Sequence, residues 1–322
     1  MIRSLVFCDG QVISHDLDVD ALRVVRADKG FLVWVDLSAP TPEENKAVLE
    51  NLFAFHPLAI EDCLSFSQMP KIEDFEEYLF IVMHCLELSE EKDLITSEID
   101  VFLGKSFLVT HHTREFKFLQ ELQDRLIRHA TLPVRGPDRV AHMVFNNIIS
   151  HYKPVADRLS IDLEELEDAI LGPEKTTGIQ AILDLRRRFT DLRRVMRPQV
   201  EIIHRLSRGG SPFLRTHLLP YYRDLYDQLV RIEDRADHDN ERLMLDFDVY
   251  MNRTANEANE GIKVLTSLTA ITLPPVLVGT WYGMNFHSIP EFEAPHAYLA
   301  VILFTLSGML GMFIWLRSKK WF

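Results

Sequence analysis

Two charge-free segments near the C-terminus constrain this chain more than any other feature of its sequence. Residues 264–286 and 298–316 contain no Asp, Glu, Lys or Arg. A helix needs roughly 20 apolar residues to cross a bilayer, and each segment approaches or exceeds that length. The link between them is short and holds two prolines. The sequence therefore predicts an antiparallel pair of membrane helices.

Charges around this pair predict its orientation. Basic residues flank the two segments at the ends that lie away from the link: Lys263, Arg317, Lys319 and Lys320. The link carries no Lys or Arg but does carry Glu291 and Glu293. Because positively charged flanks stay inside, both termini are expected in the cytoplasm of a multi-pass protein of the inner (plasma) membrane. The two link acids then face outward, where they can raise the local cation concentration.

Composition excludes several classes of protein. The formal net charge is −13, which argues against nucleic-acid binding because phosphates require a basic surface. The acidic excess suits cation binding, and it equally suits plain solubility. Cys8, Cys63 and Cys85 form no pair with disulfide or structural zinc spacing, which favours a reducing compartment. No phosphate-binding GxxxxGK[ST] loop and no nucleophile–base arrangement is found, so we expect no enzyme and no ATP coupling.

The first 140 residues have the pattern of an α+β domain. Asp9-Gly10 and Gly104-Lys105 mark hairpin turns between short apolar runs. Thr41 begins a helix with the signature of a capping box. Strands that alternate with helices predict a sheet covered by helices.

Helical periodicity dominates the middle of the chain. Residues 139–170 and 177–206 are predicted to be helices, separated by a Gly-Pro break. Residues 221–272 contain no proline and one glycine, so one long stalk helix is expected to run into the first membrane span. Such a stalk suits mechanical coupling between a soluble domain and a pore, and it is also what a plain coiled-coil stalk looks like.

The predicted organisation has seven segments. They are a cytosolic α/β domain (1–140), a cytosolic helical hairpin (141–220), a stalk helix (221–262), a first membrane helix (263–286), an outer loop (287–296), a second membrane helix (297–316) and a basic cytosolic tail (317–322). Acids are dense on the first helix of the hairpin, at Asp162, Glu164, Glu165, Glu167 and Asp168. This run is either a solvated surface or an electrostatic attractant for cations.

A stripe on the first span has a functional interpretation. Its members follow 3–4–3–4 spacing and share one helix face: Thr266, Thr269, Leu273, Val276 and Thr280. Hydroxyls on such a face either line a water-filled path or bond to a neighbouring helix. One helix pair cannot enclose a pore, so a pore requires several copies of the chain.

The chemistry of a divalent cation suits the end of this span. Mg²⁺ gives up its waters reluctantly, so a selective pore can bind the hydrated ion through neutral oxygens. A ring of Asn285 side chains has that chemistry, and Gly283 permits a close backbone approach.

The tripeptide Gly283-Met284-Asn285, with its setting, resembles the CorA family of magnesium and cobalt channels, the two-span GxN superfamily. The setting includes Ile289-Pro290-Glu291 after the span and the basic tail from Arg317. The resemblance extends over essentially the whole chain, to the motifs 263–266, 56–62 and 70–73.

The resemblance implies a funnel-shaped homopentamer with Gly283, Met284 and Asn285 at the outer pore mouth. The pore-lining positions that it implies are Asn259, Ile262, Leu265, Thr266, Thr269, Leu273, Val276 and Thr280. Val276 and Thr280 depart from the residues that are expected there. Lys319 and Lys320 would form a basic collar around the cytosolic end of the pore.

Regulation by intracellular Mg²⁺ is also implied by the resemblance. An Arg-Asp-x-Tyr-Asp motif at the start of the stalk makes Asp224 the ligand. Its partner acid would come from a neighbouring subunit, and Glu90, Glu91 and Asp93 are candidates from composition alone. Mg²⁺ bridging these acids would stabilise a closed state, because its loss leaves like charges facing each other.

The expected function is membrane-potential-driven uptake of Mg²⁺ and Co²⁺. Met284 favours the magnesium/cobalt branch of the superfamily. A Zn²⁺ transporter of the same architecture, with or without proton coupling, is the alternative. His287 and His296 are either ligands for such a softer ion or ordinary exposed histidines. A membrane-tethered sensor or scaffold without a pore is the third interpretation.

Overall fold

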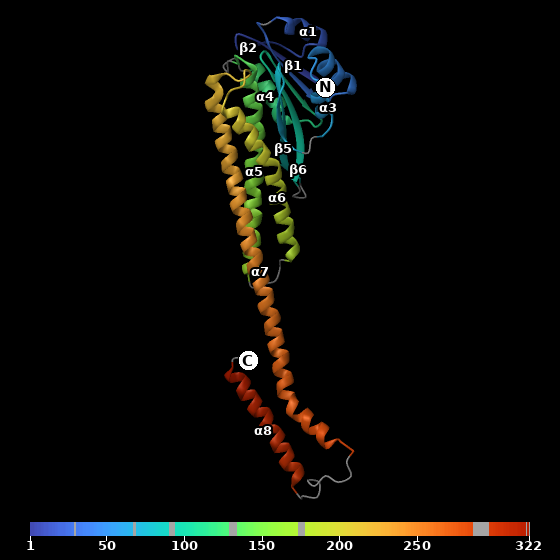
Figure 1. Ribbon diagram of the computed structural model, residues 1–322, viewed down its shortest axis with the longest axis vertical. Coiled ribbons are helices and arrows are strands. Elements are labelled where there is room, and N and C mark those ends of the chain that lie inside the picture. The colour runs from blue at the N-terminus through green and yellow to red at the C-terminus, as the bar shows by residue number, and fades with distance from the viewer. Residues whose placement is uncertain are drawn as a thin grey trace. The chain divides into compact units, whose positions relative to one another are not determined.

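The computed structural model describes residues 1–28, 30–66, 69–89, 94–128, 134–172, 178–285, 296–319 and 321 (Figure 1). The chain divides into two compact units, Met1–Met244 and Leu245–Phe322. The first unit holds a sheet and the helices that cover it. The second holds the C-terminal part of one long helix and a final apolar helix.

Seven strands form one mixed sheet in the described part of the first unit. The strands are β1 (Ile2–Cys8), β2 (Gln11–His15), β3 (Leu32–Ser38), β4 (Lys71–Asp74), β5 (Tyr78–Leu88), β6 (Leu94–Gly104) and β7 (Phe107–His112). Their spatial order is β2-β1-β3-β7-β6-β5-β4. Only β3 and β7 pair in parallel, and the other neighbours are antiparallel. This parallel pair lies at the centre, where both faces of the sheet are covered.

Helices cover both faces, which makes a three-layer domain (Figure 1). One face packs against α1 (Val19–Ala27), η1 (Lys46–Leu52) and α3 (Pro57–Leu64). The other packs against α5 (Pro137–Leu171) and α6 (Ile179–Ser207). Successive side chains of a strand point to opposite faces, so β7, which is buried along its whole length, and the buried part of β5 supply both cores at once.

The predicted hairpins and the helix start are confirmed. β1 pairs with β2 across Asp9-Gly10, and β6 pairs with β7 across the second predicted turn. Thr41 makes both reciprocal bonds of a capping box at the start of α2 (Pro42–Asn45). The sequence did not predict that this helix widens at once into the π-helical turn η1, which buries Val48 and Leu49.

After the last strand, β7, the described chain continues through α4 (Lys117–Arg128) and then the long helices α5 and α6. A short 3₁₀ turn, η2 (Thr216–Leu218), leads into α7 (Leu219–Tyr282). Hydroxyl and carboxylate contacts join the start of α7 to α5; for example, the Ser160 hydroxyl donates to Asp239 at 2.5 Å.

The acidic run on α5 is partly used for packing. Asp162 is 9% exposed, and its oxygens lie 2.8 Å from Arg158 and 2.9 Å from Arg188 of α6. Glu167 lies 2.7 Å from Arg242 of α7. These two acids therefore hold neighbouring helices together, whereas Glu164, Glu165 and Asp168 are exposed.

Two helices are long and apolar enough to cross a membrane. One ends at Tyr282, and the other is α8 (Ala297–Ser318). Within the most apolar stretch of each, 6% of the residues are buried inside the chain. A core helix of a soluble protein would be mostly buried, so this exposure fits surfaces that face lipid or other copies of the chain.

Candidate ion pathway

All eight predicted pore-lining residues lie on α7 and are exposed. We call this set the α7 stripe: Asn259, Ile262, Leu265, Thr266, Thr269, Leu273, Val276 and Thr280. Its apolar members are far from covered, with Leu265 65% and Val276 58% exposed. An apolar surface of this kind on a polypeptide needs lipid or protein against it.

Helix α8 covers the opposite face of α7. Ser267 is fully buried, and a Cβ built on Gly308 of α8 would lie 3.5 Å from the Cβ of Pro274. A cavity of about 550 Å³ between the two helices is lined by Val278 of α7 and by residues near the start of α8. At about 100° per residue, Val276 stands about half a turn away from Ser267. Among the residues that the structure describes, the α7 stripe is thus left without a partner in its own chain.

Two threonine hydroxyls of the stripe are bonded within the helix. Thr269 donates to the Leu265 carbonyl oxygen at 2.9 Å, and Thr280 donates to the carbonyl oxygen of Val276. Both of these hydroxyl protons are therefore used, and each oxygen keeps lone pairs that accept hydrogen bonds. The stripe consequently offers acceptors, which are what the water shell of a cation requires.

Prolines add a second source of acceptors. Pro274 and Pro275 lie inside α7 and have no N–H to donate. The carbonyl groups of Ala270 and Ile271, four residues earlier, lose their usual helical partners as a result. Freed carbonyls at membrane depth are tolerated where another helix or water satisfies them.

The tripeptide 283–285 follows the helix instead of belonging to it. The Gly283 N–H donates to the Gly279 carbonyl oxygen at 3.0 Å, and Tyr282 is the last helical residue. A Cβ on Gly283 would lie 2.9 Å from that same oxygen, closer than real Cβ contacts allow. Asn285 is exposed and has left the helix. The first membrane helix therefore ends four residues before its expected bound at 286, because glycine closes it.

Several predicted residues lie outside the described part of the chain: His287, Glu291, Glu293 and Lys320, with Glu90, Glu91 and Asp93. The other basic-collar residue, Lys319, is described and exposed just after α8, where its N–H closes the helix end on Leu316 and Trp315. His296 immediately precedes α8.

The predicted regulatory ligand Asp224 is exposed near the start of α7. One of its carboxylate oxygens accepts a hydrogen bond from Gln228 at 2.6 Å. An exposed carboxylate with a free second oxygen suits a hard cation that keeps most of its waters. Asp224 is thus available for a metal, and its predicted partner acids are among the residues not described.

The start of α7 beside Asp224 is firmly attached to α5. Asp138 is 1% exposed and receives Arg215 side-on, through Nε at 2.9 Å and a terminal nitrogen at 2.5 Å. The Tyr222 hydroxyl donates to the Asp138 carbonyl oxygen at 2.8 Å. A force on this end of α7 is therefore passed directly to the three-layer domain.

His142 lies in the same attachment, with its ring edge-on to Tyr221 and Tyr222 at centroid distances of 5.7 and 5.5 Å. Burial, together with the nearby Arg139, lowers the pKa of His142 to about 4, against smaller opposing effects of the Tyr221 backbone and Asp224. The ring is therefore neutral at physiological pH.

One group of potential ligands escaped the sequence analysis. Cys63, Asp100 and His111 come from α3, β6 and β7, and the structure brings them together. Metal motifs are recognised by close spacing along the chain, and these residues are far apart in sequence. Only the strand pairing and the packing of α3 reveal the group.

Known proteins match nearly the whole chain. The CorA-like Mg²⁺ transporter protein family matches residues 29–320. A Bacillus subtilis protein named for metal ion transport, YfjQ, is 30% identical over 291 residues, which cover 90% of this chain and 89% of its own. The cobalt/magnesium transport protein CorA of Thermotoga maritima is 26% identical over 309 residues, covering 94% of this chain and 87% of the relative.

The fold also matches a full-length solved structure. The complete structure of the CorA magnesium transporter from Methanocaldococcus jannaschii superposes with a TM-score of 0.80 at 22% identity, and it covers 99% of this chain and 98% of its own. The agreement spans the mixed-sheet domain, the long helix and the final helix. Sequence match and fold together lead to one conclusion: the chain belongs to the CorA-like Mg²⁺ transporter family.

Proposed function

We propose that this chain forms a passive channel for hydrated Mg²⁺, with Co²⁺ as a second substrate. The observation that carries the proposal is the α7 stripe, an exposed row of acceptors and apolar side chains opposite α8 that leads to Asn285. Neutral oxygens accept hydrogen bonds from the waters of Mg²⁺ without binding the ion too tightly. The membrane potential supplies about 2.3 kcal/mol per charge per 100 mV, so no further energy source is needed.

The proposed pore requires several copies of the chain. One α7–α8 pair cannot surround a path, so we propose a ring in which α7 of each subunit faces the axis and α8 faces lipid. The homopentamer that the resemblance implies is the expected form of this ring, in the plasma membrane with both termini in the cytoplasm. Lys263, Arg317 and Lys319 stand at the cytoplasmic ends of the spans and support this orientation.

Cytosolic Mg²⁺ is proposed to regulate the channel through Asp224. The exposed carboxylate, together with an acid of the neighbouring subunit, would hold the ion between subunits. Because the start of α7 is attached to α5 by Arg215 and Asp138, movement at that contact is transmitted along α7. Loss of Mg²⁺ would leave acids facing each other and favour an open state.

Ion flux tests the proposed channel directly. Purified full-length protein in proteoliposomes should take up Mg²⁺ when the potential inside is negative, and Asn285→Ala should reduce this flux more than about tenfold. Met284→Leu, which preserves an apolar side chain beside Asn285, is the matched control and should retain most of the flux. Unchanged flux in Asn285→Ala would refute the role of the Asn ring.

Substrate identity is decided in the same assay. The name of YfjQ specifies no ion, so Mg²⁺, Co²⁺ and Zn²⁺ are compared at several pH values. Mg²⁺ and Co²⁺ flux that is independent of a proton gradient supports the proposal. Zn²⁺ flux that follows the proton gradient, without Mg²⁺ flux, identifies a proton-coupled zinc transporter instead. No flux of any of the three ions identifies a sensor or scaffold.

A further inference from the structure

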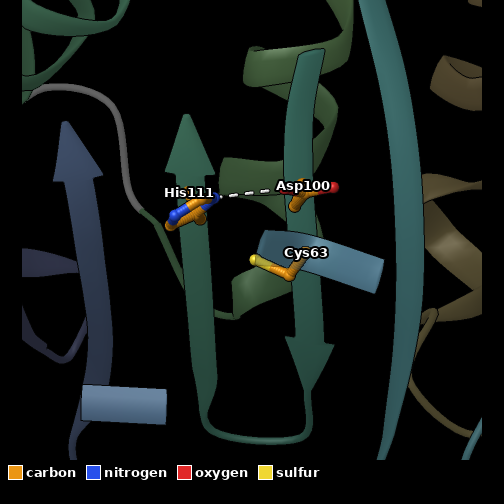
Figure 2. A group of neighbouring side chains, drawn as sticks. All are labelled: Cys63, Asp100 and His111. Carbon is orange, nitrogen blue, oxygen red and sulfur yellow. Dashed lines mark hydrogen bonds and ion pairs between the residues drawn. The ribbon is translucent and has the colours of Figure 1, made fainter. Parts of the chain in front are cut away.

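A compact group of three different donor types lies inside the first unit (Figure 2). The thiol of Cys63, a carboxylate oxygen of Asp100 and a ring nitrogen of His111 all lie within 4.8 Å of one another. Figure 2 shows Cys63 on a helix beside the strand that carries Asp100, with His111 on the neighbouring strand. His111 Nδ1 and Asp100 Oδ2 are 3.2 Å apart. The group therefore lies between α3 and the sheet.

The position of the group follows from the strand pattern. Asp100 and His111 face each other across the β6–β7 pair. They share a sheet face with Phe102 and Val109, which belong to the core under α3. The side chain of Cys63 comes down onto this face from the last turn of α3. Three separate elements thus converge on one point.

All three residues are almost completely excluded from solvent. Cys63 is 3% exposed, and Asp100 and His111 are each 2% exposed. Asp100 Oδ1 is buried and has no hydrogen-bond partner among the described residues. A buried carboxylate oxygen without a partner costs about 1–3 kcal/mol or more. The other oxygen, Oδ2, faces His111 within the group.

Metal binding at the group must displace protons. Burial raises the pKa of the Cys63 thiol, and the neighbouring Asp100 raises it further. Burial also raises the pKa of Asp100, and so does the nearby Glu98 on the same strand. A divalent cation would replace these protons, and its charge would be compensated by the thiolate and the carboxylate.

We propose that Cys63, Asp100 and His111 bind one borderline-soft divalent cation, Zn²⁺ or Co²⁺, as a structural site in the cytosolic domain. Thiolate and imidazole are ligands for such ions, whereas Mg²⁺ prefers oxygen. Ligand atoms around a tetrahedral ion are about 3.3–3.8 Å apart, given Zn–S and Zn–N bonds of about 2.3 and 2.0 Å. A contraction of about 1 Å brings the present arrangement to that geometry. The ion would fasten α3 to β6 and β7.

Cobalt serves as the probe because thiolate coordination changes its spectrum. The full-length protein is produced with Co²⁺ in the growth medium, so that metal is present while the chain folds around the closed site. After purification in detergent and treatment with EDTA, retained cobalt and zinc are counted and the absorption spectrum is recorded. We expect about one retained ion per chain, with thiolate-to-cobalt charge-transfer absorption and strong visible bands of tetrahedral Co²⁺.

Variants identify the ligands. Cys63→Ser should abolish the charge-transfer absorption, and Asp100→Asn and His111→Gln should lower the retained metal. Cys85→Ser is the matched control: Cys85 is equally buried, in β5, and is not a member of the group. Its position in the strand points it to the opposite sheet face from Phe80 and Val82. This variant should retain the ion and the spectrum.

Two outcomes would overturn the proposal. The first is a parent protein that retains neither cobalt nor zinc after EDTA, a result that needs no variant and does not depend on folding of the mutants. The second is unchanged charge-transfer absorption in Cys63→Ser. The cations that pass through the proposed pore or bind at Asp224 meet oxygen ligands only and give no thiolate band, so they do not interfere.

Discussion

At the level of single residues, glycine at 283 is required by backbone contact. A Cβ at this position would lie 2.9 Å from the Gly279 carbonyl oxygen, whereas a Cβ at Gly279, inside the helix, would meet nothing within 4 Å apart from the helix's own backbone. A side chain at position 283 would thus clash with the backbone, whereas one at position 279 would point into open space. The difference follows from the helix end, where the chain closes on itself before Asn285.

Gly283→Ala is therefore expected to reduce Mg²⁺ flux several-fold, because the backbone must shift and carry Asn285 with it. Gly279→Ala, in which the added methyl group meets open space, should transport nearly as well as the parent. Flux in proteoliposomes, normalised to the amount of reconstituted protein, gives the comparison. Equal loss in both variants would show that helix propensity, not the close contact at 283, is responsible.

The lowered pKa of His142 predicts that the folded protein loses stability in acid. Its folded pKa of about 4, lowered mainly by burial, lies below the unfolded value near 6.5, so the unfolded chain takes up the proton first. The stabilisation is complete above pH 6.5 and falls as the pH drops toward 4. Because the ring is partly exposed, we expect the free energy of unfolding to fall by about 1–2 kcal/mol between pH 7 and pH 5.

Thermal unfolding of the full-length protein in detergent at pH 7 and pH 5 measures this effect. His142→Phe keeps an aromatic ring between Tyr221 and Tyr222 but has no titratable group. Its melting temperature should fall less between the two pH values than that of the parent. An identical fall in both proteins would assign the acid sensitivity to other groups.

At the level of elements, α7 has two faces with different partners. Ser267, Pro274 and Val278 face α8, and the α7 stripe faces away. If the stripe lines a path for ions, water must reach it in the assembled protein. The α8-facing side should stay closed in every state, because its partner belongs to the same chain.

Cysteine labelling tests the two faces. Single cysteines at Thr269 or Val276 should react with a small, membrane-impermeant cationic thiol reagent roughly tenfold faster than a cysteine at Val278. Cys8, the only partly exposed native cysteine, is first replaced by Ser, and Cys63 and Cys85 remain as buried background. Equal rates at all three positions would contradict a water-filled path along the stripe.

Much of this architecture was predictable from local patterns. Two-residue periodicity, turn signals and the Thr41 capping box predict strands and helix starts, because each depends on residues a few positions apart. Five members of the α7 stripe, from Thr266 to Thr280, were visible from spacing, whereas Asn259, Ile262 and Leu265 came from the family resemblance. The packing roles of Asp162 and Glu167 were not, since their arginine partners lie on other helices. The meeting of Cys63 with Asp100 and His111 likewise depends on tertiary contacts that no short motif encodes.

At the level of the whole molecule, the proposed Mg²⁺ switch joins chemistry at one end of α7 to the proposed path at the other. α7 is a single helix of 64 residues, and no loop interrupts it between Asp224 and Tyr282. Just before this helix, Arg215 is attached to the buried Asp138 of α5.

Limited proteolysis of the full-length protein over a range of Mg²⁺ concentrations tests this switch. Asp224→Ala should raise the Mg²⁺ concentration for half-protection roughly tenfold, because a ligand is lost. Asp234→Ala removes an equally exposed acid farther along α7 and serves as the control. The same Mg²⁺ dependence in Asp224→Ala and the parent would count against Asp224 as a ligand.

The exposed stripe opposite α8 also has a genetic consequence. If every chain contributes one wall to a shared path, an altered chain damages each ring that it enters. Cells that produce intact and Asn285→Ala chains together would then contain few wholly intact rings, and this fraction falls as a power of the number of subunits. A defective allele of a protein that forms such rings is therefore expected to be dominant.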